Sequence, residues 1–190
     1  MQTAHELFIH ELEDMLSAEH QLVKALQEQE ENASNEQLKK AFAAHRAQTE
    51  KHIERLNGCF EEIGETPEET ECKGIAGLVE EYKTFKDEED PSPDILDVFS
   101  IDAAKKVEMY EINAYEGLIE MAEDMGHKKS VRLLNQTLKE EQQTFKKMEA
   151  FGKKIKPENS GMEEEEDEES GSPRKKSAGR GSKSKGKRAA

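Results

Sequence analysis

The chain has 190 residues, of which 33% are hydrophobic and 37% charged, and its formal net charge at pH 7 is −15. No run approaches the ~20 apolar residues that span a bilayer, and the N-terminus lacks the layout of a signal peptide, so we expect a cytoplasmic protein with no membrane association. Two cysteines are too few for a disulfide framework or a thiolate metal site. A Trp-free composition rich in Leu, Ala, Glu and Lys favours an all-α fold.

The first two predicted helices form a hairpin. Thr3 is the expected N-cap of a helix that runs to the Glu30–Asn32 region. A second helix begins after Ser34, with Gln37 completing an S-x-x-Q capping box, and it ends near Gly64. Because the turn between them is short, the two helices are expected to be antiparallel neighbours.

A crossover of nearly thirty residues separates this hairpin from a second one. It contains one short helix candidate at 72–86, followed by the helix-breaking run at 90–93. The third long helix then runs from about Asp94 to Met125, Gly126 ends it, and the fourth runs from near Lys128 to residues 152–156. This order predicts one four-helix bundle over residues 1–156, with a short fifth helix in the crossover.

The remaining residues, 157–190, differ in composition from the bundle. An acidic block precedes a basic segment rich in Gly, Ser, Lys and Arg, and eight acidic residues balance eight basic ones. We interpret this segment as a disordered tail, because it has too little apolar area to offset its ordering entropy. Residues 1–156 therefore carry the whole charge of −15, and such an acidic domain repels nucleic acid and attracts cations.

Each long helix carries a metal-competent side chain in the middle of its apolar stripe, at Glu19, His45, Glu111 and Glu141. Glu19 lies about 13 residues before the first turn and His45 about 12 after it, so with a rise of ~1.5 Å per residue they face each other within about one turn. Glu111 and Glu141 each lie about 15 residues from the turn at Gly126, which places them at matching levels as well.

Further candidate ligands lie three residues away on the same faces, at Gln48, Glu108 and Thr144. Each predicted metal ligand offers a carboxylate, amide or imidazole donor. The predicted ligands are Glu19, His45, Gln48, Glu108, Glu111 and Glu141. Four buried carboxylates without a nearby Lys or Arg cost several kcal/mol each unless cations neutralise them. This oxygen-rich set suits iron, two ions per chain, or manganese, rather than zinc.

Three neighbouring residues can also be explained by roles other than metal binding. His52 shares the stripe of His45 but lies two turns, ~10 Å, along it, so we interpret it as a buried or hydrogen-bonded histidine rather than a ligand. Tyr115 is interpreted as a packing residue, with a hydrogen bond to a carboxylate as the alternative. For Glu140, an outward-facing position and a place in the site both remain open.

Five segments of the chain are specific enough to compare with known proteins. They are ELFIHELEDMLSAEHQLVKAL at 6–26, LKKAFAAHRAQTEKHIERL at 38–56, CKGIAGLVEE at 72–81, AAKKVEMYEINAYEGLIEMAEDMG at 103–126 and LLNQTLKEEQQT at 133–144. In this order they resemble the bacterial YciE/YciF family of ferritin-like proteins over residues 4–155. The resemblance implies an up-down-down-up four-helix bundle, a homodimer, and a di-metal centre that is usually described as a ferroxidase and tied to stress response.

The chain departs from the ferritin pattern at two places. The positions that match Glu-x-x-His read His45-Arg-Ala-Gln48 and Glu141-Gln-Gln-Thr144, and family relatives often carry Glu at the Gln48 position. A site with one weaker ligand favours one tightly bound and one loosely bound metal. Metal binding is therefore a firmer expectation than catalysed oxidation, for which the metal centre itself, and no separate catalytic residue, would be responsible.

The leading hypothesis is a ferritin-like di-iron or di-manganese protein that acts as a ferroxidase, with oxygen or peroxide as the oxidant, in oxidative or general stress response. The alternative is a non-catalytic stress or nucleoid-associated protein that binds DNA through its basic tail. A metal-free helical scaffold is the third. For the tail, weak nucleic acid contact and a plain solubilising role both remain open, because the acidic block could cancel the attraction of the basic segment.

Overall fold

The computed structural model describes residues 2–157 as five α-helices, with no strand among these residues. The helices are α1 (Ala4–Asn32), α2 (Glu36–Ile63), α3 (Lys73–Glu89), α4 (Pro93–Met125) and α5 (Lys128–Lys154). The predicted all-α fold is confirmed, including the short helix in the crossover, which ends three residues later than predicted. The predicted tail at 157–190 lies almost wholly outside the described residues, so both the tail and the boundary before it stay predictions.

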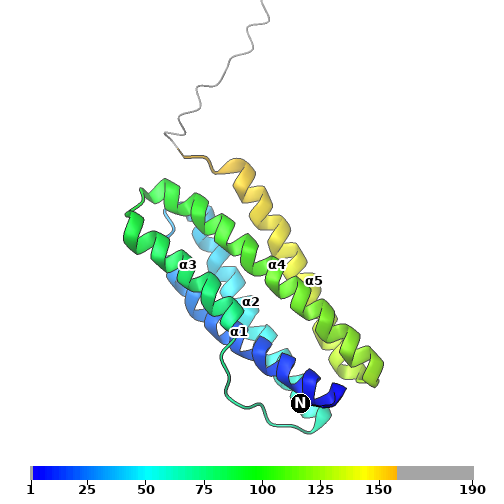
Figure 1. The fold of residues 1–190 in the computed structure, drawn as a ribbon. Coiled ribbons are helices and arrows are strands. Elements are labelled where there is room, and N and C mark those ends of the chain that lie inside the picture. The colour runs from blue at the N-terminus through cyan, green and yellow to red at the C-terminus, as the bar shows by residue number, and fades with distance from the viewer. Residues whose placement is uncertain (1, 158–190) are drawn as a thin grey trace, which may run out of the picture. The chain divides into compact units, whose positions relative to one another are not determined.

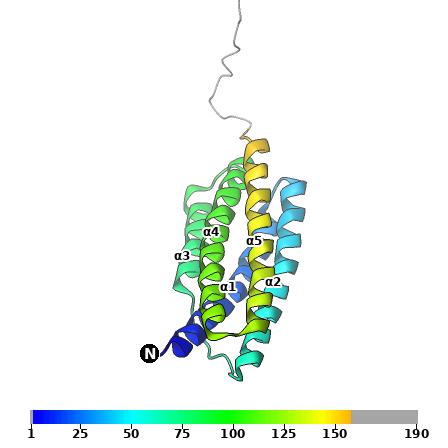
Figure 2. The same ribbon diagram turned by 90° about the vertical axis from the view of Figure 1, so that its right-hand side faces the viewer.

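The four long helices form a bundle in which α1 and α2, and likewise α4 and α5, are antiparallel neighbours (Figure 1). The segment between α2 and α3 starts at the end of the bundle where α1 begins, and α3 carries the chain back to the opposite end, where α4 starts. Two further contacts close the ring, between α2 and α5 and between α1 and α4 (Figure 2). The topology is therefore the expected up-down-down-up arrangement, with α3 packed outside α1 and α4.

The helix ends follow from local chemistry. Thr3 and Glu6 form a reciprocal capping box at the start of α1, as expected from Thr3 as the N-cap. Gly64 and Gly126 end α2 and α4 with φ of 75° and 76°, the left-handed conformation that glycine adopts without steric cost. Pro93 occupies the first turn of α4, where its missing N–H removes no helical hydrogen bond.

The predicted capping box at Ser34 and Gln37 is wrong. Asn35 is the N-cap of α2, and its side chain accepts hydrogen bonds from the backbone N–H groups of Gln37 and Leu38. Ser34 does not cap α2. Its hydroxyl donates to Asp97 Oδ2 over 2.6 Å, and its N–H donates to Asp97 Oδ1. The local cap has moved one residue along the chain to Asn35, and Ser34 contacts α4 instead.

Two apolar clusters fill the bundle interior. One contains Leu56 of α2, Tyr115 of α4 and Leu134 of α5, and the other, further along the same helices, contains Phe42, Ala104 and Met148. Between them on α2, α4 and α5 the buried side chains are polar: His45, Thr49, His52, Glu108, Glu111, Thr137, Glu141 and Thr144. This polar layer is the only interruption of the interior that those three helices share within the described residues. Over residues 2–157, every helix is too short or too polar to cross a membrane.

Candidate metal centre

Four long helices each contribute to one buried centre. Its side chains are almost fully buried, at 0% to 5% exposure, and they are Glu19 of α1, His45 and His52 of α2, Glu108 and Glu111 of α4, and Glu141 of α5. All of them lie on the apolar stripes of their helices, so packing of the stripes brings them together. The predicted meeting of the four interrupted stripes is thus seen in the structure for the carboxylates and for His45.

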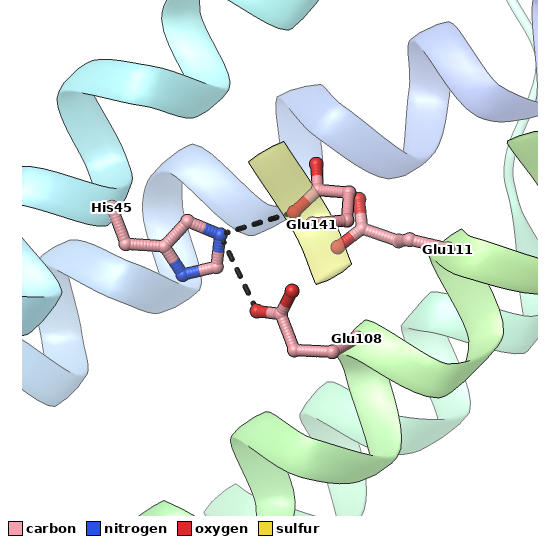
Figure 3. Close-up of side chains that lie close together, drawn as sticks. All are labelled: His45, Glu108, Glu111 and Glu141. Atoms are coloured by element: carbon pink, nitrogen blue, oxygen red, sulfur yellow. Dashed lines mark ion pairs between the residues drawn. The ribbon is translucent and has the colours of Figure 1, made fainter. Parts of the chain in front are cut away.

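One half of the centre is built around His45 (Figure 3). The Nε2 atom of His45 lies 3.4 Å from Glu108 Oε1 and 3.7 Å from Glu141 Oε2. Glu111 completes this half, because each of the four residues offers a donor atom within 4.8 Å of the other three. Three carboxylates and one imidazole from α2, α4 and α5 could hold a metal ion here.

The other half is built around His52. Its Nδ1 atom lies 2.7 Å from Glu141 Oε1 and 3.4 Å from Glu19 Oε1, and the three residues again offer donor atoms within 4.8 Å of one another. Glu141 belongs to both halves, with Oε2 facing His45 and Oε1 facing His52. A carboxylate that presents one oxygen to each half has the arrangement needed to bridge two ions.

Half of the carboxylate oxygens of the centre have no polar partner. Of the eight oxygens on Glu19, Glu108, Glu111 and Glu141, three contact only the nitrogens of His45 or His52, and four are buried with neither a hydrogen bond nor an ion pair among the described residues: Glu19 Oε2, Glu108 Oε2 and both oxygens of Glu111. The eighth, Glu19 Oε1, accepts a hydrogen bond from the Tyr115 hydroxyl. No Lys or Arg of residues 2–157 pairs with these four side chains. Buried oxygens with unused lone pairs are costly unless a cation satisfies them, so this donor set fits divalent metal ions.

The protonation equilibria of the centre depend on burial and on the two histidines. Burial raises the pKa of Glu108 and of Glu111 well above its usual value, and the charge of Glu141 raises both further. Burial opposes ionisation of Glu141 also, but contacts with His45 and His52 lower its pKa to about 2. Burial would lower the pKa of His52, yet contacts with Glu141 and Glu19 raise it to about 10. Bound cations would favour the ionised form of all four carboxylates.

A second group of side chains contacts His52 on the Nε2 side of its ring, opposite Glu19 and Glu141. Its Nε2 atom lies 3.0 Å from Glu140 Oε2, and Arg55 donates to both oxygens of Glu140 over 2.7 Å and 3.0 Å. Arg55 also donates to the hydroxyl of Thr137. A carboxylate on one imidazole nitrogen fixes the ring so that the other nitrogen faces the site, an arrangement common behind metal-binding histidines. Glu140 therefore supports the centre instead of turning away from it.

The predicted site residues fall into three classes. Glu19, His45, Glu108, Glu111 and Glu141 come together. Gln48 is half-buried on α2 and forms no hydrogen bond within the described residues, so its role as a ligand stays a prediction. Thr144 is buried, and its hydroxyl donates to the backbone carbonyl of Glu140.

His52 is buried and hydrogen-bonded to Glu140, as predicted. It also lies against Glu19 and Glu141, a position that was not predicted from the sequence. Two signals could have found it. The position on α2 that lies opposite Glu19 falls between His45 and His52, so each histidine is about one turn from that level. Thr49-x-x-His52 also has the three-residue spacing of the Glu-x-x-His motif, with Thr49 buried in place of the glutamate.

Comparisons with known proteins agree with the fold and with its extent. Residues 3–160 match the family described as "Domain of unknown function (DUF892)". The chain is 39% identical over 145 residues to Protein YciF of Escherichia coli K12, covering 76% of this chain and 87% of that protein. The crystal structure of the E. coli stress protein YciF superimposes with a TM-score of 0.76 at 37% identity, covering 80% of this chain and 96% of that one. A structure of YcfI from Rhodopseudomonas palustris gives 0.75 at 36% identity, covering 78% and 94%.

Proposed function

The chain belongs to the DUF892 family, as YciF-like proteins do, and from its buried centre we propose that it binds two iron or manganese ions between its helices and oxidises Fe(II). The observation that carries the proposal is a set of four buried carboxylates, four of whose oxygens have no polar partner, distributed over two histidine-containing groups that share Glu141. Oxygen and imidazole donors of this kind suit iron and manganese, and bundle cores are where ferritin-like proteins build such centres.

Under this proposal, each residue of the centre has a specific role. Glu108, Glu111 and His45 would hold one ion, Glu19 and His52 the other, and Glu141 would bridge them. Iron would supply the redox chemistry when bound: two Fe(II) give up two electrons, which together with two protons reduce one dioxygen to hydrogen peroxide, or one hydrogen peroxide to two waters. The apolar clusters on either side would keep bulk water from the buried ligands.

The proposal predicts metal-dependent oxidation that needs Glu111. After anaerobic loading with Fe(II), the wild-type chain should retain iron through a desalting column and form Fe(III) when dioxygen or peroxide is added. Glu111→Gln keeps the size of the side chain but removes a charge from the centre, so it should lose iron and slow oxidation. Glu116→Gln, an exposed site on the same helix, is the matched control. Retention of less than one ion per chain, with equal retention in Glu111→Gln, would refute metal binding.

The biological setting is proposed by similarity. YciF of E. coli is described as a stress protein, and we extend an oxidative or general stress role, and a homodimeric state, to this chain. Fe(II) and peroxide together generate damaging radicals, so a protein that consumes both is consistent with such a role. Size-exclusion chromatography with light scattering tests the dimer.

The alternative, DNA binding through the basic segment at 174–188, depends on residues outside the described range. It is tested by deleting residues 158–190. If DNA binding by the full chain disappears with this segment and does not depend on metal, the alternative is correct. If neither the full chain nor the truncated chain retards duplex DNA at moderate salt, the alternative is wrong.

A further inference from the structure

A cavity lies beside the metal centre, between α1, α4 and the crossover helix α3. It is about 20 Å³ in volume, which is room for one small molecule. Its inner end is formed by His45 and Glu108, two residues of the first half of the centre. The cavity is therefore next to the candidate metal ligands without being part of the cluster that they form.

Most of the side chains that line the cavity are apolar and come from three helices. These are Leu22, Ala25 and Leu26 of α1, Leu78 and Val79 of α3, and Ala103, Ala104 and Val107 of α4. Besides His45 and Glu108, the polar lining residues are Glu28 and Gln29 of α1 and Tyr82 of α3. A water molecule in a protein interior normally needs two to four polar partners, whereas apolar cavities of this kind stay dry and take up apolar gases. Because apolar side chains make up most of this lining, the cavity favours a small apolar molecule over an ion.

The crossover helix α3 forms the outer wall. It packs against α1 and α4 (Figure 2), and Glu28 at the outer rim is paired with Lys86 of α3. Leu78 and Val79 are only half-buried, so this wall is thin. A molecule that enters between α3 and the bundle would meet apolar surface until it reaches His45 and Glu108.

We propose that this cavity is a dioxygen-binding site that delivers the oxidant to the His45 and Glu108 side of the metal centre. Dioxygen is small and apolar, which matches both the volume and the lining, whereas hydrogen peroxide is a polar hydrogen-bonding molecule that the lining disfavours. The choice of oxidant rests on the proposed function. The affinity of the cavity for an apolar gas does not rest on the proposed function, because it depends only on the side chains that line the cavity.

Xenon is the probe of choice, because it occupies dry apolar cavities and needs no metal. Crystals of the metal-free full chain under xenon pressure should show one xenon atom among Leu22, Leu26, Ala104 and Val107. Ala104→Leu should fill the space and lose this atom. Ala25→Leu, at a half-buried position, is the second filling variant in case Ala104→Leu fails to fold, and Ala150→Leu, at an exposed position on α5, is the control that should keep the xenon. An ordered water in place of xenon in the wild-type chain, or xenon retained in both folded filling variants, overturns the proposal.

The second arm uses the Fe(II)-loaded protein. The filling variants should bind as much iron as the wild type, oxidise it more slowly with dioxygen, and oxidise it at the wild-type rate with peroxide. An unchanged dioxygen rate in a variant that has lost xenon overturns delivery through the cavity. If the wild-type chain binds no iron, the proposed function fails on that measurement, while the xenon result still decides whether the cavity binds apolar gas.

Discussion

The orientation of His52 depends on side chains that never reach the centre. Glu140 contacts its Nε2 atom, and Arg55 holds both oxygens of Glu140. Glu140 is one-quarter exposed, yet its position is fixed from two sides, and Arg55 and His52 lower its pKa against the opposing effect of burial. The residues that position a ligand are therefore as much part of this centre as the ligand itself.

Glu140→Gln should weaken metal binding without removing any donor of the centre. Loss of the carboxylate behind a metal-binding histidine typically costs roughly 10- to 100-fold in affinity, and we expect a decrease in this range by anaerobic competition with a chelator. Glu149→Gln, at an exposed position on the same helix, should bind as the wild type does. Equal affinity in Glu140→Gln and the wild type would show that His52 is oriented by packing alone.

At the scale of helices, the bundle depends on acidic side chains that cap one helix from another. Asp97 of α4 accepts three hydrogen bonds from the turn between α1 and α2, from the N–H and hydroxyl of Ser34 and the N–H of Asn35. Glu62 of α2 accepts the N–H groups of Lys129 and Ser130 at the start of α5, and the Ser130 hydroxyl as well. Each carboxylate satisfies N–H groups that a local cap would otherwise bind.

Asp97→Ala should lower the free energy of unfolding by about 1–3 kcal/mol, because it removes three hydrogen bonds that a buried carboxylate accepts from the turn before α2. Urea unfolding followed by circular dichroism measures this loss. Asp102→Ala, one turn further along α4 at an exposed position, removes only surface ion pairs and should change stability little. Equal stabilities of the two variants would contradict the role given to Asp97.

Glu62 gives the stability a defined pH dependence. Burial acts to raise its pKa, but the hydrogen bonds from Ser130 and Lys129 outweigh burial and lower it below the usual carboxyl value. A lowered folded-state pKa means that this contribution is fully present above the unfolded pKa and is lost as the pH falls through the folded pKa. Glu62→Gln should thus cost about 0.5–2 kcal/mol at pH 7 and progressively less at acidic pH. Glu61→Gln, its exposed neighbour, should show neither effect, and a cost for Glu62→Gln that is the same at pH 3 and pH 7 would contradict the assignment.

The helix boundaries were predictable because single residues set them. Thr3, Gly64, Pro93 and Gly126 act through local backbone geometry, which the sequence alone specifies. The N-cap of α2 was not predictable in this way, because Ser34 donates to Asp97, sixty-three residues away. Long-range partners of this kind override a local motif whenever the tertiary fold offers a stronger acceptor.

The meeting of side chains at the candidate centre was predictable where one polar residue lay alone on its stripe. Level and spacing identified Glu19, His45, Glu111 and Glu141. The contact of His52 with Glu19 and Glu141 was not predicted, because its distance was judged from His45 along one helix. The two histidines instead face opposite oxygens of Glu141, so they serve different halves of the centre. Which half of the centre each histidine faces depends on how far along its axis α5 packs against α2. That offset is fixed only in the packed bundle.

At the scale of the whole bundle, the polar layer divides an apolar interior. Without cations, burial keeps Glu108 and Glu111 from ionising readily, and three of their four oxygens have neither a hydrogen bond nor an ion pair within the described residues. Ions bound to the folded chain but not to the unfolded one would stabilise the bundle by about 2.7 kcal/mol at a hundredfold excess over Kd. The four helices and the metal ions are thus expected to stabilise each other.

The most direct test of this account is an anaerobic calorimetric titration of the metal-free chain with Fe(II) or Mn(II). The account predicts two ions per chain in the wild type and in Glu116→Gln, and loss of both in Glu141→Gln, because Glu141 alone belongs to both halves of the centre. Binding by Glu141→Gln with the stoichiometry and affinity of the wild type, or less than one ion per wild-type chain, would contradict it.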